Sequence, residues 1–107
     1  MPQPIRVLLA DDHAVVRKGI REFLEEDPAI VVVAEASNGQ EALHLLAEHQ
    51  PQIAVLDVQM PVLNGIEATQ QIKATQPAVR VLILTAYEDD PYIFALLRAG
   101  ADGYILK

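Results

Sequence analysis

Residues 5–24 read IRVLLADDHAVVRKGIREFL, an apolar run followed by an acidic pair and a segment with helical spacing. The run from Ile5 to Ala10 is rich in β-branched residues and leucine, which favours a strand buried on both faces of a parallel sheet. After the acidic pair, apolar residues recur at i, i+4, i+7 and i+8, namely Val16, Ile20, Phe23 and Leu24. This stretch therefore predicts a strand, an acidic loop and an amphipathic helix, which is the opening unit of an α/β fold.

The same alternation continues along the chain. Further short apolar runs predict strands at Ile30–Ala34, Ile53–Leu56, Val79–Thr85 and Gly103–Leu106. Helical spacing and caps predict four helices: one ending before Asp27-Pro28, one from about Gly39 to Gln50, one from Gly65 to Thr75, and one from an Asp89/Asp90 cap with Pro91 to Gly100. We expect Ala42, Leu43, Leu46 and Ala47 of the second helix to face inward. The fourth helix carries Ile93, Leu96 and Leu97 at helical spacing. Strict alternation predicts a doubly wound five-stranded parallel sheet with helices on both faces.

Composition excludes several classes of protein. A chain of 107 residues is the size of one domain, and 51% hydrophobic against 21% charged residues excludes intrinsic disorder. Without cysteine there is no disulfide, thiolate zinc site or cysteine nucleophile. No apolar run approaches the roughly 18 residues of a membrane span and no signal segment is evident, so a cytoplasmic location without membrane contact is expected. A net charge of −7 argues against a nucleic-acid surface on these residues.

Polar residues follow four of the predicted strands. Asp11 and Asp12 follow the first, Asp57 the third, Thr85 closes the fourth, and Lys107 follows the fifth. In open parallel sheets ligands bind beyond the carboxyl ends of the strands, so these side chains are expected around one crevice. Three carboxylates repel one another unless a cation joins them, and oxygen-only ligands favour Mg²⁺. Threonine and lysine can bind phosphate oxygens. Each residue alone also fits a cap, a strand residue or a solvated lysine, but the combination predicts a phosphate-handling site.

Four stretches together resemble the receiver domain of two-component response regulators, in particular the LuxR/NarL (FixJ)-type subfamily. They are Arg6–Ile20 (RVLLADDHAVVRKGI), Asp57–Thr69 (DVQMPVLNGIEAT), Val81–Tyr87 (VLILTAY) and Leu97–Lys107 (LRAGADGYILK). The resemblance covers nearly the whole chain and implies a flavodoxin-like sheet of order 2-1-3-4-5.

The resemblance also implies a role for each site residue. Asp57 would accept a phosphoryl group from a sensor histidine kinase or a phosphotransfer protein. Asp11, Asp12, Asp57 and the backbone carbonyl of Gln59 would hold Mg²⁺. The chain would then be no enzyme beyond self-phosphorylation and slow autodephosphorylation at Asp57.

Further residues are implicated in signalling. Thr85 and Lys107 would bind the phosphoryl group, and Tyr104 would turn inward as Thr85 moves, which would change a partner-binding face. Gln59 and Tyr87 lie two residues after Asp57 and Thr85, and would tune the lifetime of the phosphoryl group. Met60-Pro61 and Gly65 would shape the loop after Asp57.

Receivers of this kind carry a fifth helix after the lysine. Residues 1–107 are therefore expected to form a receiver domain truncated at that helix, with apolar strand surface exposed where the helix would lie. A DNA-binding domain for transcription regulation is expected downstream, so DNA would be bound only through residues that are not in this sequence. A homodimer is a further option for the partner.

Three alternatives remain. A stand-alone receiver would act through protein–protein binding. A haloacid-dehalogenase-like phosphatase would need a second acid two residues after its nucleophile, where this chain has Asp57-Val58-Gln59. A flavin or nucleotide carrier would need a phosphate loop rich in glycine or serine and threonine where Asp11-Asp12-His13 stands. His13, His44 and His49 are expected to be exposed helix residues and not metal ligands.

Overall fold

The computed structural model describes residues 3–86 and 92–107. The strands are β1 (Ile5–Ala10), β2 (Ile30–Ala36), β3 (Ile53–Asp57), β4 (Arg80–Thr85) and β5 (Gly103–Leu106). The helices are α1 (Ala14–Glu25), α2 (Gly39–His49), α3 (Gly65–Thr75) and α4 (Tyr92–Arg98). All five strands run parallel in the order β2-β1-β3-β4-β5, which confirms the predicted doubly wound sheet.

Element boundaries differ little from those predicted. β2 continues two residues past Ala34, and β3 includes Asp57. α2 ends one residue before Gln50, whose left-handed φ of 48° terminates the helix. The predicted cap at Asp89 and Asp90, with Pro91, lies outside the described residues.

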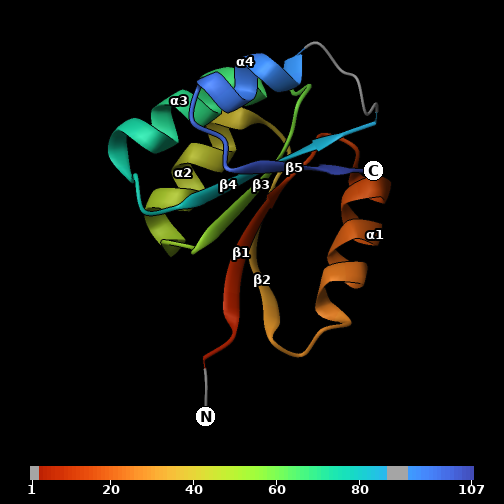
Figure 1. The fold of residues 1–107 in the computed structure, drawn as a ribbon. Helices are drawn as coiled ribbons and strands as arrows, with labels where there is room; N and C mark the ends of the chain where they lie inside the picture. Colours follow the sequence, from red (N-terminus) through yellow and green to blue (C-terminus); the bar gives the residue numbers. More distant parts are fainter. Residues whose placement is uncertain (1–2, 87–91) are drawn as a thin grey trace.

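Helices cover both faces of the sheet, but unequally. Figure 1 shows α2, α3 and α4 together on one face and α1 alone on the other. Leu8, Leu56 and Ile83 of the sheet are buried with Leu46 and Ile72 in the larger core, on the side of α2 to α4. A smaller core, which includes Leu9 and Val55, lies against α1. Among the described residues, no helix is both long and apolar enough to cross a bilayer.

The face beside α1 is incompletely covered. None of the residues of α1 is fully buried, and Phe23 of its apolar stripe is 72% exposed. A groove of about 450 Å³ runs between α1 and β5, and its walls are almost entirely apolar. Ile20 and Leu24 line one wall, and Ile105 and Leu106 the other. The expected exposure of apolar surface on this face is therefore confirmed.

Ala47, which was predicted to face inward, does not, and one apolar residue of α4 is also exposed. Ala47 of α2 is exposed, while its neighbours Ala42 and Leu46 are buried. Leu97 of α4 is 41% exposed and lies beside Tyr104 of the edge strand β5. Helical spacing indicates which face of a helix is apolar, but the extent of the covering layer decides how far around that face burial reaches.

Asp102, in the loop between α4 and β5, joins three elements. Its Oδ2 lies 2.7 Å from Lys73 Nζ of α3 and accepts a hydrogen bond from the Val81 N–H of β4 at 2.9 Å. Its Oδ1 lies 3.3 Å from Arg80 Nη1. The hydrogen bond from Lys73, followed by that from Val81, lowers the pKa of Asp102 below its ordinary value. The carboxylate thus holds the entry to β5 against α3 and β4.

Replacing Asp102 by asparagine is expected to lower the free energy of unfolding by about 1 kcal/mol at pH 7, because the charge-assisted bonds weaken. A lowered folded-state pKa stabilises the fold above the ordinary value of 3.8, and this contribution is lost as the pH falls through the folded-state pKa. Urea denaturation of both proteins across pH should show a constant deficit above about pH 5 that shrinks below about pH 4. A deficit that persists unchanged in acid would contradict an electrostatic role.

Candidate functional site

The carboxyl ends of the strands meet at one edge of the sheet. β1 leads directly into Asp11 and Asp12, β3 ends on Asp57, β4 ends on Thr85, and β5 leads into Lys107. β1 pairs with β3, β3 with β4 and β4 with β5, all in parallel. The topology therefore delivers these five residues to one place from distant parts of the sequence.

The acidic side chains form a tight cluster. Asp11, Asp12, Asp57 and His13 each offer one ligand atom, and these atoms all lie within 4.8 Å of one another. Asp11 is fully buried, Asp57 is 4% exposed, and the Asp12 side chain is 30% exposed. Two buried carboxylates beside a third at this spacing repel one another strongly unless cations offset their charge.

Lys107 provides one such cation. Its Nζ lies 3.0 Å from Asp57 Oδ2 and 3.3 Å from Asp11 Oδ2. Its backbone N–H donates to the Thr85 carbonyl at 2.8 Å, so the sheet ladder positions the residue. Burial of the ammonium tends to lower the pKa of Lys107, but Asp57 and Asp11 outweigh this and raise it. Lys107 is therefore charged at neutral pH.

Asp57 is held by its own loop as well as by the lysine. Its Oδ1 accepts a hydrogen bond from the Gln59 N–H at 3.3 Å, and the Val58 N–H donates to the Leu84 carbonyl at 3.0 Å. Burial raises the pKa of Asp57 above its ordinary value, and the charge of Asp11 adds to this, whereas the hydrogen bond and charge of Lys107 oppose it. The carboxylate is positioned by the protein but poorly compensated in charge.

The donor set fits a hard divalent cation. Asp11 Oδ1 accepts a hydrogen bond from the His13 N–H at 2.8 Å, while the buried Asp11 Oδ2 has no hydrogen-bond partner in the described part of the chain. This oxygen makes no hydrogen bond within residues 3–86 and 92–107 and is contacted by the Lys107 ammonium at 3.3 Å. Set beside two further carboxylates, it is suited to Mg²⁺, which prefers oxygen ligands. Asp11, Asp12 and Asp57 are the residues able to hold it.

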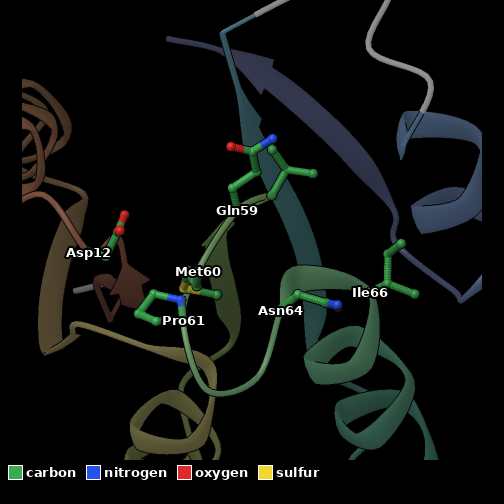
Figure 2. A pocket seen from close by; sticks show the side chains of 7 residues that line it. Asp12, Gln59, Met60, Pro61, Asn64 and Ile66 are labelled. Carbon is green, nitrogen blue, oxygen red and sulfur yellow. The ribbon is translucent and has the colours of Figure 1, made fainter.

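Two adjoining cavities surround the cluster. A polar one of about 160 Å³ is lined by Asp57 and Lys107 and is large enough for a few water-sized groups. A larger one of about 410 Å³ shares Asp12 and Gln59 with it. Figure 2 shows Gln59, Met60 and Pro61 along the loop after β3. Asp12 lies to the left of this loop in the view, and Ile66, on α3, lies to its right. The site is thus open to an incoming group over this loop.

The loop after β3 is shaped by a strained turn. The Leu63 N–H donates to the Pro61 carbonyl at 2.8 Å, and Val62 between them has a φ of 70° although it carries a branched Cβ. Gly65 follows where an added Cβ would lie 3.0 Å from the Asp57 carbonyl. Glycine at this position lets the start of α3 approach the backbone of Asp57 closely.

Thr85 and Gln59 lie beside the cluster, whereas Tyr104 lies further back along β5, next to Ile83 and α4. Thr85 is fully buried at the end of β4 and is paired in register with Leu106. Tyr104 is 44% exposed on β5, in register with Ile83. Gln59 is exposed and lines the polar cavity, and Tyr87 lies outside the described residues.

His13 belongs to the cluster, although the sequence predicts that it is not a metal ligand. It is exposed, as expected, but it is not a helix residue, because it lies in extended conformation just before α1. Its Nδ1 lies 3.1 Å from Asp12 Oδ1 and 3.5 Å from Asp11 Oδ1. Its adjacency to Asp12 in sequence was the only signal, because the geometry depends on its position just before α1. His44 is exposed near Glu48 on α2, whereas His49 is half-buried, contrary to expectation.

Together the sheet order and this cluster define a doubly wound α/β protein with an acidic pocket at the carboxyl edge of its sheet. Residues 7–107 match the model of the response regulator receiver domain, and the chain belongs to that family. Receiver domains bind Mg²⁺ at an acidic pocket of this kind.

Curated relatives are regulators of transcription and signalling. The chain is 43% identical over 103 residues to the transcriptional regulatory protein LiaR of Bacillus subtilis, covering 96% of this chain and 49% of LiaR. It is 43% identical over 104 residues to the oxygen regulatory protein NreC of Staphylococcus haemolyticus, covering 96% and 48%. The chain therefore spans about half the length of these relatives.

Solved structures agree on the fold. A LuxR-family two-component response regulator from Aurantimonas superposes with a TM-score of 0.92 at 40% identity, over 98% of this chain and 75% of that one. The receiver domain of NarL from Mycobacterium tuberculosis gives 0.92 at 32% identity, over 98% and 85%. RcsB from Salmonella enterica, bound to the promoter rprA with phosphomimetic BeF₃⁻, gives 0.86 at 28% identity, over 98% and 54%.

Val62→Gly is expected to stabilise the protein. The left-handed conformation costs a branched residue roughly 1–2 kcal/mol, whereas glycine adopts it freely and loses only about 0.5–1 kcal/mol through its more flexible unfolded state. Because Val62 is 78% exposed, its side chain contributes little packing. Chemical denaturation should show a gain of up to about 1 kcal/mol for glycine, and less for the control Val62→Ala, which keeps a Cβ. A clear loss on glycine substitution would show that the side chain matters more than the strain.

Asp57→Asn is expected to stabilise the metal-free protein by about 1 kcal/mol at neutral pH. Since the folded-state pKa of Asp57 is raised, its ionised form opposes folding above that pKa, and the penalty disappears as the pH falls below the ordinary value of 3.8. Denaturation in the presence of a chelator should show the gain at pH 7 and its decrease in acid. Asp12→Asn, at the more exposed carboxylate, is the matched control with a smaller gain. Destabilisation by Asp57→Asn would mean that its ion pair with Lys107 outweighs burial.

Proposed function

We propose that this chain is the phosphoacceptor receiver domain of a two-component response regulator, acting in the cytoplasm. Asp57 takes a phosphoryl group from the phosphohistidine of a sensor histidine kinase or a phosphotransfer protein. The observation that carries the proposal is the placement of Asp57, nearly buried at the end of β3, with Lys107 at 3.0 Å and two further carboxylates within 4.8 Å.

The chemistry is a phosphoryl transfer between two nucleophiles. An Asp57 carboxylate oxygen attacks phosphorus, and the bond between phosphorus and the donor's imidazole nitrogen breaks. The electron pair leaves with the imidazole, which is a neutral leaving group once it carries a proton. Asp57 then bears an acyl phosphate. No catalytic cycle on a separate substrate is implied, and only slow hydrolysis of the acyl phosphate follows.

The remaining site residues compensate charge. Asp11, Asp12 and Asp57, with the backbone carbonyl of Gln59, would hold Mg²⁺, which supplies neutralisation of the phosphoryl oxygens when bound. Lys107 would transfer its ion pair from Asp57 to a phosphoryl oxygen, and Thr85 would donate its hydroxyl hydrogen to another. The exposed side chain of Gln59 would tune the lifetime of the acyl phosphate, as would Tyr87.

The output is a change in packing beside β4 and β5. Phosphorylation adds about −1.5 to −2 charges and new acceptor oxygens next to Thr85. A shift of Thr85 towards the phosphoryl group would free space on the neighbouring strand, where the half-exposed Tyr104 could turn inward. Such a change is a population shift between two packings of one fold.

In its full-length context we place a DNA-binding domain after this receiver. The proposal rests on the curated relatives, which are regulators about twice as long as this chain, and on RcsB, which is seen on a promoter. A stand-alone receiver that acts through protein–protein binding, with itself or another partner, is the second candidate. Promoter binding by the full-length gene product, with and without phosphorylation, separates the two: phosphorylation-dependent binding supports the first, and none supports the second.

Phosphorylation is tested by incubating the chain with Mg²⁺ and acetyl phosphate. Intact mass spectrometry should show one phosphoryl increment that hydroxylamine removes, as expected for an acyl phosphate. Asp57→Asn should abolish it, and Asp12→Asn should reduce it at low Mg²⁺. Asp102→Asn, remote from the cluster, is the control and should label like the wild type. Equal labelling of the Asp57→Asn protein would show that another residue is the acceptor.

A further inference from the structure

Two arginines one turn apart on α1 bind the same glutamate but differ in their other contacts. Arg17 Nε lies 3.0 Å from Glu35 Oε1 of β2, and an Nη of Arg21 contacts Glu35 Oε2. Arg17 Nη1 also donates to the backbone carbonyl of Asp11 at 2.7 Å. Arg21 instead binds Glu25, one turn further along the helix, at 3.0 Å. Of these two arginines, Arg17 is the one that the described residues show connecting the ion-pair network to the acidic loop of Asp11, Asp12 and His13.

The Arg17 contact completes the fixation of Asp11. The Asp11 N–H donates to the Ala36 carbonyl at 3.0 Å, extending the sheet ladder, and its Oδ1 accepts from the His13 N–H. The carbonyl of Asp11 lies between the two acidic residues, so the guanidinium fixes the peptide plane that joins Asp11 to Asp12. A planar guanidinium can hold a carbonyl and a carboxylate at once in a fixed relative geometry, which the single point charge of a lysine cannot.

We propose that Arg17, oriented by Glu35, is a positioning residue for the cation-binding carboxylates of Asp11 and Asp12. The inference rests on the proposed function, since it concerns the Mg²⁺ site of that function. Glu35 has two effects: it orients the guanidinium and offsets a positive charge that would otherwise repel a cation close by. Residues that orient metal ligands without touching the metal commonly change metal affinity by 10-fold or more when they are altered.

Electrostatics and positioning predict effects of opposite sign. Removing a positive charge near a cation site strengthens cation binding if only Coulomb energy matters. Removing a group that orients two ligand carboxylates weakens it. Arg21 offers a matched comparison, because it is a cation on the same glutamate without a contact to the acidic loop.

The test is calorimetric titration of the metal-free proteins with Mg²⁺. Arg17→Met is expected to weaken Mg²⁺ binding about 10-fold, while Arg21→Met changes it by less than about 2-fold. Arg17→Lys keeps the positive charge but loses the planar guanidinium, and its Mg²⁺ affinity should resemble that of Arg17→Met. Unchanged or tighter binding by Arg17→Met overturns the inference, as does equal weakening by both methionine variants.

Glu35→Gln provides an independent variant. It should weaken Mg²⁺ binding in the wild-type background but add little to Arg17→Met, because the two residues act as one unit. If the two substitutions weaken Mg²⁺ binding in a fully additive way, the inference is overturned. Urea denaturation without metal should give the two methionine variants similar free energies of unfolding, since each loses one arginine from Glu35. A loss of Mg²⁺ affinity that parallels a loss of stability across the variants would also overturn the inference. If the wild type binds no Mg²⁺, the proposed function fails, whereas normal binding by wild type and Arg17→Met alike removes only the positioning role.

Discussion

The burial of two aspartates beside Lys107 sets the electrostatic demand that the surrounding protein has to meet. Asp11 and Asp57 are almost inaccessible, yet both are carboxylates, and Lys107 contacts both of them. Charges out of water are costly unless they are paired and hydrogen-bonded. The protein meets part of that cost with Lys107 and two backbone N–H groups, and leaves a residual negative charge that a divalent cation can offset.

Under the proposed function, this imbalance would suit a switch. A site that is already neutral gains little from binding a cation or from acquiring a phosphoryl group, whereas an under-compensated one responds to both. The lysine is held at the end of β5 through the Thr85 carbonyl, so under the proposed function a change in its ion pair would act on β4 and β5. Asp102 anchors the opposite end of β5 to α3 and β4.

The two faces of the sheet differ in how they support the site. The face beneath α2 to α4 contains the larger core and supports the loop after Asp57 through the buried Met60 and Leu63. The face beneath α1 is thinly covered and has an open apolar groove. There α1 is attached through Ile20 and Leu24, which pack against the smaller core, and through the ion pairs of Arg17 and Arg21 with β2. A helix with no fully buried residue is thus the one that contacts the Asp11 backbone.

Local sequence patterns were sufficient to predict the alternation of strands and helices, most element boundaries, and the gathering of Asp11, Asp12, Asp57 and Lys107 at one edge. Runs of buried residues and helical spacing are local properties, and parallel topology then places every strand end on the same side. Three features emerged from the folded arrangement instead: His13 joins the cluster, Ala47 and Leu97 are exposed, and Arg17 contacts the Asp11 carbonyl. These outcomes depend on how far each helix is covered and on the rotation of α1 against β2, which arise from packing between residues distant in sequence and leave no periodic trace in it.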